Sequence, residues 1–232
     1  MAAAPAAPDV AAAVFGPRLS LAVRYASLLA TSGVERGLIG PREVDRLWER
    51  HLLNCAVVGA VIPDDSRVID VGSGAGLPGV ALALAWPSLT ITLLEPMARR
   101  VEWLSEILAE LDLPVTVVRG RAEDRSVIDS LAGADVATAR AVAPLARLAG
   151  WTLPLLRPGG LLVAMKGQTA MDEVTRDRAA VRSLGGRAIE VHDCGDGIVD
   201  PLTRVVLVSR DDAAGHGQSG VGQRPARKRR RS

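Results

Sequence analysis

The sequence predicts an α/β fold built on a doubly wound, mostly parallel sheet, and three observations support this prediction. From Arg67 onward, short apolar runs alternate strictly with amphipathic stretches of helical spacing, the pattern of parallel strands joined by helical crossovers. A glycine-rich segment follows the first apolar run, and two β-rich runs near the end have no helix between them. With 232 residues, of which 48% are hydrophobic, the chain can bury one sizeable core.

Two helices are expected ahead of the sheet. The first covers residues 18–31, and its inward face carries Leu19, Ala22, Val23, Ala26, Leu29 and Ala30. The second begins at Pro41, because proline is favoured at the first helical position, and ends near the turn at residues 63–65. Its inward residues are Val44, Leu47, Trp48, His51, Leu52, Cys55 and Val58. We expect residues 1–62 to form an N-terminal helical cap beside a domain over residues 63–210 that holds the sheet.

Seven strands are expected in that domain. Five short buried strands are predicted at Val68–Val71, Thr90–Leu94, Val115–Val118, Val136–Thr138 and Leu161–Met165. Helices fill the gaps, among them Met97–Leu111 and a helix around residues 172–184. The last two runs, Ala188–His192 and Arg204–Ser209, predict a terminal antiparallel hairpin.

Charge is distributed unevenly along the chain. The net charge is +2, but six of the 28 basic residues and only two of the 26 acidic residues lie at or beyond Asp211, which leaves the body slightly acidic. Overall basicity is therefore no evidence that the folded body binds RNA. We expect residues 211–232 to be a disordered basic tail, either an arm that contacts phosphates or a solvated segment that aids solubility.

The sequence argues against several other classes of protein. Cys55 and Cys194 lie far apart and form no CxxC or His/Cys cluster, so we expect neither a disulfide framework nor a metal site. The Ala- and Pro-rich start has no basic segment, and no stretch approaches about 18 uninterrupted apolar residues. We expect a cytoplasmic protein that neither is secreted nor spans a membrane.

The most informative motif is the segment Asp70–Gly79, in which a buried strand leads through Gly72, Gly74 and Gly76 into a helix. Glycines allow a tight turn and a close backbone approach to a ligand. The last six residues of this segment, Gly74–Gly79, also fit the GxGxxG pattern of dinucleotide-binding proteins. The glycines alone therefore do not distinguish an NAD site from an S-adenosylmethionine site. Asp70 favours S-adenosylmethionine, because its carboxylate can orient the loop and accept the methionine ammonium. A glycine turn that merely packs a helix on a strand is the alternative.

Two further segments supply candidate cofactor contacts. Glu95 ends the second strand roughly 20 residues beyond the glycine loop, where its carboxylate can accept both hydroxyls of a ribose. After the third strand, Ala122 and Glu123 are placed beside an adenine. A helix N-cap role for Asp124, and also for Glu123, is the alternative for this segment.

If the cofactor is S-adenosylmethionine, the residue types that are missing limit which atom of the substrate can accept the methyl group. Methylation of a pyrimidine C5 needs a nucleophilic thiolate, and residues 67–167 contain no cysteine. Methylation of an exocyclic amine usually goes with an Asn/Asp-Pro-Pro-aromatic turn after the fourth strand, where this chain has Ala139-Arg140-Ala141-Val142 instead. A ring nitrogen such as guanine N7 has a free lone pair and needs only positioning in a desolvated pocket.

Arg140 and Lys166 are the candidate catalytic residues, since each lies at a strand end, on the edge where open α/β sheets bind ligands. Because N7 must stay free for attack, we assign Arg140 to guanine O6, a phosphate or the cofactor carboxylate. Solvated charges at strand ends are the alternative. We interpret His51 as a packed or hydrogen-bonded structural residue, and Trp48, Trp103 and Trp151 as core residues.

As a set, these residues resemble one family, the glucose-inhibited division protein B family of ribosomal RNA small-subunit methyltransferases. The resemblance covers about residues 40–170 and runs through Glu49-Arg50-His51, Asp70–Gly79, Leu94-Glu95, Arg99-Arg100, Arg121-Ala122-Glu123, Arg140-Ala141-Val142 and Lys166-Gly167. Departures are Leu77 for the usual Phe, Arg99 for Lys, Asn54 for an acidic residue, and no Trp-Asn pair near Thr31-Ser32.

The resemblance implies a Rossmann-like class I fold and S-adenosylmethionine-dependent methylation of guanine N7 in the decoding region of 16S ribosomal RNA. It implies cofactor contacts at Gly72, Leu77, Ala122, Glu123 and Arg140. The implied partner is 16S RNA, the small ribosomal subunit or an assembly intermediate. We expect the protein to bind it as a monomer. Methylation of another RNA or of a small molecule remains an alternative, as do an NAD-linked oxidoreductase and a non-catalytic nucleotide-binding module.

Overall fold

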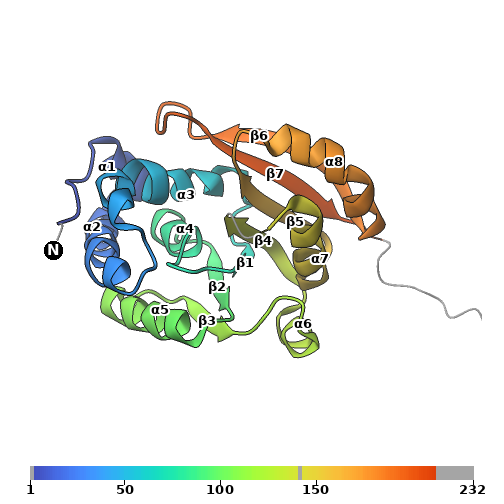
Figure 1. The fold of residues 1–232 in the computed structure, drawn as a ribbon, viewed down its shortest axis with the longest axis horizontal. Helices are drawn as coiled ribbons and strands as arrows, with labels where there is room; N and C mark the ends of the chain where they lie inside the picture. The colour runs from blue at the N-terminus through green and yellow to red at the C-terminus, as the bar shows by residue number, and fades with distance from the viewer. Residues whose placement is uncertain (1–2, 141–142, 213–232) are drawn as a thin grey trace, which may run out of the picture.

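The computed structural model describes residues 3–140 and 143–212, which form a seven-stranded sheet with helices on both faces (Figure 1). The strand order is β3-β2-β1-β4-β5-β7-β6. The first five strands in this order are parallel, and β7 runs antiparallel to both β5 and β6. The predicted doubly wound sheet with a terminal antiparallel hairpin is confirmed.

The elements follow the predicted alternation. The strands are β1 (Arg67–Val71), β2 (Thr90–Glu95), β3 (Thr116–Arg119), β4 (Ala134–Arg140), β5 (Leu156–Lys166), β6 (Gly186–Cys194) and β7 (Thr203–Arg210). The helices are α1 (Val10–Phe15), α2 (Leu19–Leu28), α3 (Asn54–Ala56), α4 (Gly79–Ala85), α5 (Ala98–Leu111), α6 (Arg125–Leu131), α7 (Leu145–Thr152) and α8 (Ala170–Ser183). Strands β4 and β5 are longer than predicted, since β4 begins at Ala134 instead of Val136 and β5 begins at Leu156 instead of Leu161.

The sheet is buried on both faces because neighbouring residues of each central strand enter different cores. In β1, Val68 packs into a core with α4, α5 and the N-terminal helices, whereas Ile69 packs into a second core with α7 and α8. This two-sided burial explains why the parallel strands are continuous apolar runs instead of alternating ones. It also leaves the carboxyl ends of the strands as the edge at which polar side chains gather.

The N-terminal helices pack over one face of the sheet, beside α4 and α5 (Figure 1). The inward face predicted for residues 18–31 is partly wrong. Val23 is 41% exposed, whereas Tyr25, which was not assigned inward, is fully buried between Ala22 and Ala26 on the core-facing side. The helix α1 was not predicted at all, because its Ala-rich sequence carries no clear apolar periodicity.

The second predicted helix is present, but its backbone is irregular. It runs through a 3₁₀ turn at Pro41–Arg46, a π-helical turn at Leu47–Leu53, the short α3 and a second 3₁₀ turn at Val57–Val61. All seven residues predicted to face inward are buried. A wider π turn changes the direction of the side chains that it carries, and His51 lies in that turn.

Two findings limit the kinds of site that the fold holds. Among residues 3–140 and 143–212, no helix is both long enough and apolar enough to cross a membrane. Within the same residues, no group of three or more His, Cys, Asp or Glu side chains is arranged to hold a metal ion. Nearly all of the predicted basic tail, residues 213–232, lies outside the described part of the chain.

Candidate cofactor and substrate site

The glycine loop joins β1 to α4, and its backbone explains its composition. Gly72, Gly74 and Gly76 have φ angles of +73°, +56° and +93°, which L side chains rarely adopt. Gly79 serves close packing instead, because a Cβ there would lie 2.3 Å from Cδ2 of Leu93. The conformation of the loop therefore favours glycine at these positions, as the sequence predicts.

Asp70 at the end of β1 orients this loop. Its carboxyl group is fully buried, and Oδ2 accepts a hydrogen bond from the backbone N–H of Gly79 at 2.9 Å. Oδ1 is also buried but has no hydrogen-bond partner among the described residues. Burial raises the pKa of Asp70 to about 7, although the Gly79 bond opposes that shift. A buried acceptor without a partner beside a glycine loop fits a ligand that brings a donor, such as an ammonium group.

Glu95 ends β2 and also contacts the loop. Its buried carboxylate accepts hydrogen bonds from the backbone N–H of Gly74 at 2.9 Å and from that of Met97 at 3.0 Å. The guanidinium of Arg100 lies 3.8 Å from the same carboxylate. Each carboxylate oxygen can accept more than one hydrogen bond, so these contacts leave capacity for ribose hydroxyls. Arg100 was not singled out as a site residue by the sequence.

The segment after β3 lies next to Glu95, because Glu95 pairs with Arg119 in the sheet register. Ala122 is buried, whereas Glu123 is exposed and lies 3.9 Å from Arg121. Asp124 occupies the N-cap position of α6, but its side chain makes no capping hydrogen bond to that helix. Asp124 therefore stands at the cap position that the alternative interpretation gave it, but its side chain does not cap the helix.

Arg140 ends β4 and is held by the N-terminal region. A guanidinium nitrogen lies 2.9 Å from Nδ1 of His51 and 3.2 Å from the carbonyl oxygen of Arg50. The other ring nitrogen of His51, Nε2, lies 3.0 Å from Oε2 of Glu43. Burial and the charge of Arg140 lower the pKa of His51 to about 4. The neutral ring accepts from Arg140 and donates to Glu43, which confirms that His51 is a hydrogen-bonded residue.

Lys166 ends β5 and is also engaged within the protein. Its side chain is 8% exposed, and Nζ donates to the carbonyl oxygen of Ala143 at 2.7 Å and pairs with Oε2 of Glu173 at 2.8 Å. The alternative of a solvated charge is therefore wrong for Lys166. Since β4 and β5 are adjacent, with Arg140 opposite Met165, the two candidate residues end neighbouring strands.

The side chain of Leu77, a predicted cofactor residue, packs into the apolar core. Its side chain is only 4% exposed and belongs to the core shared with α4 and α5. A contact between Leu77 and a ligand would therefore involve its backbone.

Tyr25 contacts the loop but is not among the residues that the sequence predicted to lie on the inward face of its helix. Its hydroxyl donates to the carbonyl oxygen of Ala75 in the loop at 2.8 Å. The spacing of Tyr25 with Ala22 and Leu29 was the available signal for its burial.

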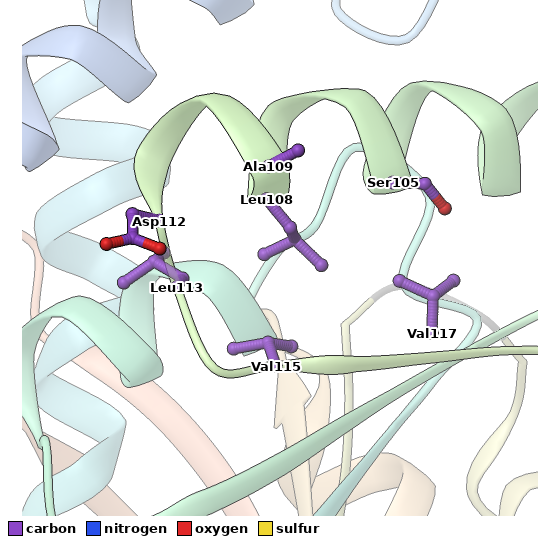
Figure 2. A pocket seen from close by; sticks show the side chains of 7 residues that line it. All are labelled: Ser105, Leu108, Ala109, Asp112, Leu113, Val115 and Val117. Carbon is purple, nitrogen blue, oxygen red and sulfur yellow. The ribbon is translucent and has the colours of Figure 1, made fainter.

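A shallow hollow lies away from this site, between α5 and β3 (Figure 2). It is lined by Ser105, Leu108, Ala109, Asp112, Leu113, Val115 and Val117. The hollow is at the amino end of β3, whereas the glycine loop follows the carboxyl end of the parallel strand β1. It therefore belongs to the opposite edge of the sheet and adds nothing to the candidate site.

Comparisons with known proteins agree with this geometry. The family model described as rRNA small subunit methyltransferase G matches residues 18–202. The Mycobacterium marinum protein named ribosomal RNA small subunit methyltransferase G is 55% identical over 207 residues, covering 89% of this chain and 91% of its own. Its namesake in Salinispora tropica is 57% identical over 213 residues, covering 88% of each chain.

Solved structures share the fold at low identity. The apo S-adenosylmethionine-dependent methyltransferase SibL aligns with a TM-score of 0.55 and 23% identity over 81% of this chain and 62% of its own. A methyltransferase from Pyrococcus furiosus aligns with a TM-score of 0.53 and 12% identity over 67% of this chain and 80% of its own. At such identities the likeness extends to the architecture alone.

Proposed function

Because the chain belongs to the rRNA small subunit methyltransferase G family, we propose that it transfers a methyl group from S-adenosylmethionine to N7 of a guanine in the decoding region of 16S ribosomal RNA. The observation that carries the choice of cofactor is the buried carboxyl of Asp70, of which one oxygen accepts from Gly79 and the other has no partner within residues 3–140 and 143–212. A negative group there suits a ligand ammonium and opposes the pyrophosphate of NAD.

The residues that would hold the cofactor lie along the carboxyl ends of β1, β2, β3 and β4. They are Asp70, Gly72, Gly74, Gly76, Leu77, Glu95, Ala122, Glu123 and Arg140. Asp70 would accept the ammonium, Glu95 the ribose hydroxyls, and the segment at Ala122 and Glu123 would flank the adenine. When bound, S-adenosylmethionine supplies an electrophilic methyl group on a sulfonium sulfur.

The side chains of this chain act by positioning. Guanine N7 carries a free lone pair, so no protein group has to remove a proton before attack. His51 is unsuited to that task in any case, because both of its ring nitrogens are engaged and its pKa is about 4. Arg140 brings a positive charge to the sheet edge for O6 or a phosphate, and Lys166 holds the backbone after β4 through Ala143.

The proposed partner is 16S RNA, presented as naked RNA, in the small ribosomal subunit or in an assembly intermediate. A looped RNA offers an unstacked or flipped base, which the reaction at N7 requires. We place the enzyme in the cytoplasm as a monomer, with residues 1–62 as a helical cap, residues 63–210 as the methyltransferase domain and the basic tail as an RNA-binding arm.

A matched pair of glycine variants tests this function. The protein is incubated with labelled S-adenosylmethionine and either 16S RNA or small subunits, and borohydride and aniline then cleave the RNA at N7-methylguanine for mapping by primer extension. Gly74→Val should abolish cofactor binding and transfer, because it places a branched side chain on the loop. Gly37→Val is the control, since Gly37 also has a positive φ and no atom within 4 Å of its Cβ position, but lies in the loop that precedes the 3₁₀ turn at Pro41–Arg46.

The expected result is one primer-extension stop in the decoding region with the wild type and with Gly37→Val, and none with Gly74→Val. Label in the RNA without cleavage would show that another atom is methylated. Transfer to no RNA, together with tight binding of NAD, would overturn the proposal.

A further inference from the structure

Among the described residues, the glycine loop receives one side-chain hydrogen bond from outside the sheet and its strand ends. Asp70 and Glu95 come from β1 and β2, but Tyr25 comes from α2 in the N-terminal region. Tyr25 is fully buried, and its hydroxyl donates to the carbonyl oxygen of Ala75 at 2.8 Å. A phenylalanine would fill nearly the same core volume but would leave the carbonyl oxygen of Ala75 without this hydrogen bond.

The peptide unit that this hydroxyl contacts flanks a glycine, so it can turn with little steric hindrance. Gly76 follows Ala75 and has a φ of +93°. The unit is held at both ends, because the N–H of Gly76 donates to the carbonyl oxygen of Ser73 at 2.7 Å. Among the described residues, Tyr25 is the donor to the other end.

The contact is also tight enough to set the shape of the loop. A Cβ at position 76 would lie 3.0 Å from the hydroxyl oxygen of Tyr25 and 2.7 Å from Cγ2 of Val80. The hydroxyl therefore lies directly against the loop backbone. Burial raises the pKa of Tyr25 well above its usual value, so the hydroxyl stays protonated and remains a donor across the physiological range.

We propose that Tyr25 is a positioning residue for the cofactor loop, which makes the N-terminal helix α2 part of the S-adenosylmethionine site. This inference rests on the proposed function. The hydroxyl keeps the Ala75–Gly76 peptide in one orientation, and with it the backbone of Gly74 on which Glu95 also acts. Without the hydroxyl, the loop samples two peptide orientations, and the binding-competent one is only part of the population.

The test compares Tyr25→Phe with Thr152→Val. Each change removes one fully buried hydroxyl that donates to a backbone carbonyl, but Thr152 bonds to Leu148 within α7, far from the loop in sequence and on the other face of the sheet. Calorimetry measures the affinity of each protein for S-adenosylhomocysteine. Amide exchange of Gly74 and Gly76 in the ligand-free protein reports on the loop itself, and denaturant unfolding reports on stability.

For Tyr25→Phe, we expect binding of S-adenosylhomocysteine to weaken roughly five- to tenfold, the size expected from losing one hydrogen bond that orders a loop. Amide exchange at Gly74 and Gly76 should quicken, and the KM for S-adenosylmethionine should rise with little change in kcat. Thr152→Val should lose similar stability and keep wild-type affinity.

Unchanged affinity and unchanged loop exchange in Tyr25→Phe would overturn the inference. Equal loss of affinity in Thr152→Val would do so as well, because the effect would then follow from stability. Failure of the wild type to bind S-adenosylhomocysteine is a different outcome, which overturns the proposed function.

Discussion

At the scale of single residues, the charge state of Asp70 links the structure to a measurement. A carboxyl buried beside Gly79 and near Glu95 has a pKa of about 7, so it is partly protonated at neutral pH in the free protein. In the unfolded chain its pKa is near the usual 3.8. Since the folded pKa is raised, the stability due to this group is fully present below about pH 4 and is lost as the pH rises through 7.

Binding of a cationic amine beside Asp70 stabilises its carboxylate form. The pKa of Asp70 therefore falls, and the carboxyl group releases its proton. We predict that S-adenosylhomocysteine binds more tightly at pH 8 than at pH 6, and that binding near pH 7 releases a fraction of a proton. Calorimetry in buffers with different ionisation enthalpies measures that release. Asp70→Asn, which can still accept from Gly79, should bind weakly without the Asp70-linked release. The same release in Asp70→Asn would assign it to another group.

A second prediction concerns the pH dependence of methyl transfer and the contribution of Arg140 to its rate. Because N7 loses no proton and His51 stays neutral with a pKa of about 4, the single-turnover rate at saturating cofactor and RNA should be nearly flat from pH 6 to 8.5. Arg140→Ala should lower that rate by on the order of tenfold or more, while the sheet stays folded. Arg147→Ala, at an exposed position of α7, is the control. A steep rise near neutrality that His51→Gln removes would make His51 a base and contradict this mechanism.

At the scale of elements, two carboxylates of α8 stabilise the start of α7. Glu173 accepts from the N–H of Leu145, and Asp177 accepts from that of Ala146, each at 3.1 Å. These N–H groups have no partner within their own helix, and negative charge is favourable at a helix N-terminus. Lys166 compensates the charge of Glu173, so one network connects β5, α7 and α8.

This network predicts that Lys166 matters for stability as well as for the site. Lys166→Met should lower the free energy of unfolding by about 2–4 kcal/mol, because it leaves the carboxylate of Glu173 without its partner. The double variant Lys166→Met/Glu173→Gln should recover at least half of the loss, since glutamine keeps the bond to Leu145. Arg125→Met, in the exposed pair with Asp129, should change stability by less than about 0.5 kcal/mol. Chemical denaturation measures all three.

An unchanged stability of Lys166→Met together with a loss of methyl transfer would contradict the structural role. Lys166 would then act on the substrate, as its place at a strand end first indicated.

The elements also show what the sequence can predict. β1, β2, β3 and α5 are predicted to within one residue at each end, because buried strands and a helix with Trp103, Leu104 and Ile107 inward have strong periodic signals, whereas the bounds of β4, β5 and β6 are predicted too short. The glycine loop was predicted because its backbone admits few other residues. The π turn at Leu47–Leu53 and the partners of His51 and Lys166 were not predicted, since they depend on side-chain geometry that periodicity does not encode and, for the pair of His51 with Arg140, on a segment 89 residues away.

At the scale of the whole molecule, the basic tail carries the last prediction. The body is slightly acidic, so we predict that residues 224–231 supply much of the long-range attraction to RNA. Deleting them should weaken the affinity for 16S RNA and make its salt dependence shallower, because fewer counterions are released. A variant of the same length with its basic residues replaced by glutamine should behave like the deletion. Filter binding across a salt series measures both, and an unaltered slope would show that the tail takes no part.

The shared core of the N-terminal helices and the α4–α5 face has a consequence for how the protein is made. Residues 1–62 are synthesised before the segments that cover them, and the core they share is completed only when β7 has been synthesised, since that core includes Val205. Until then Tyr25, Leu47 and their neighbours lack their native cover, and the nascent chain depends on chaperones or on transient collapse. Closure of this core is therefore a long-range event in folding, and residues 1–62 lack their full native cover until nearly the whole sheet has been synthesised.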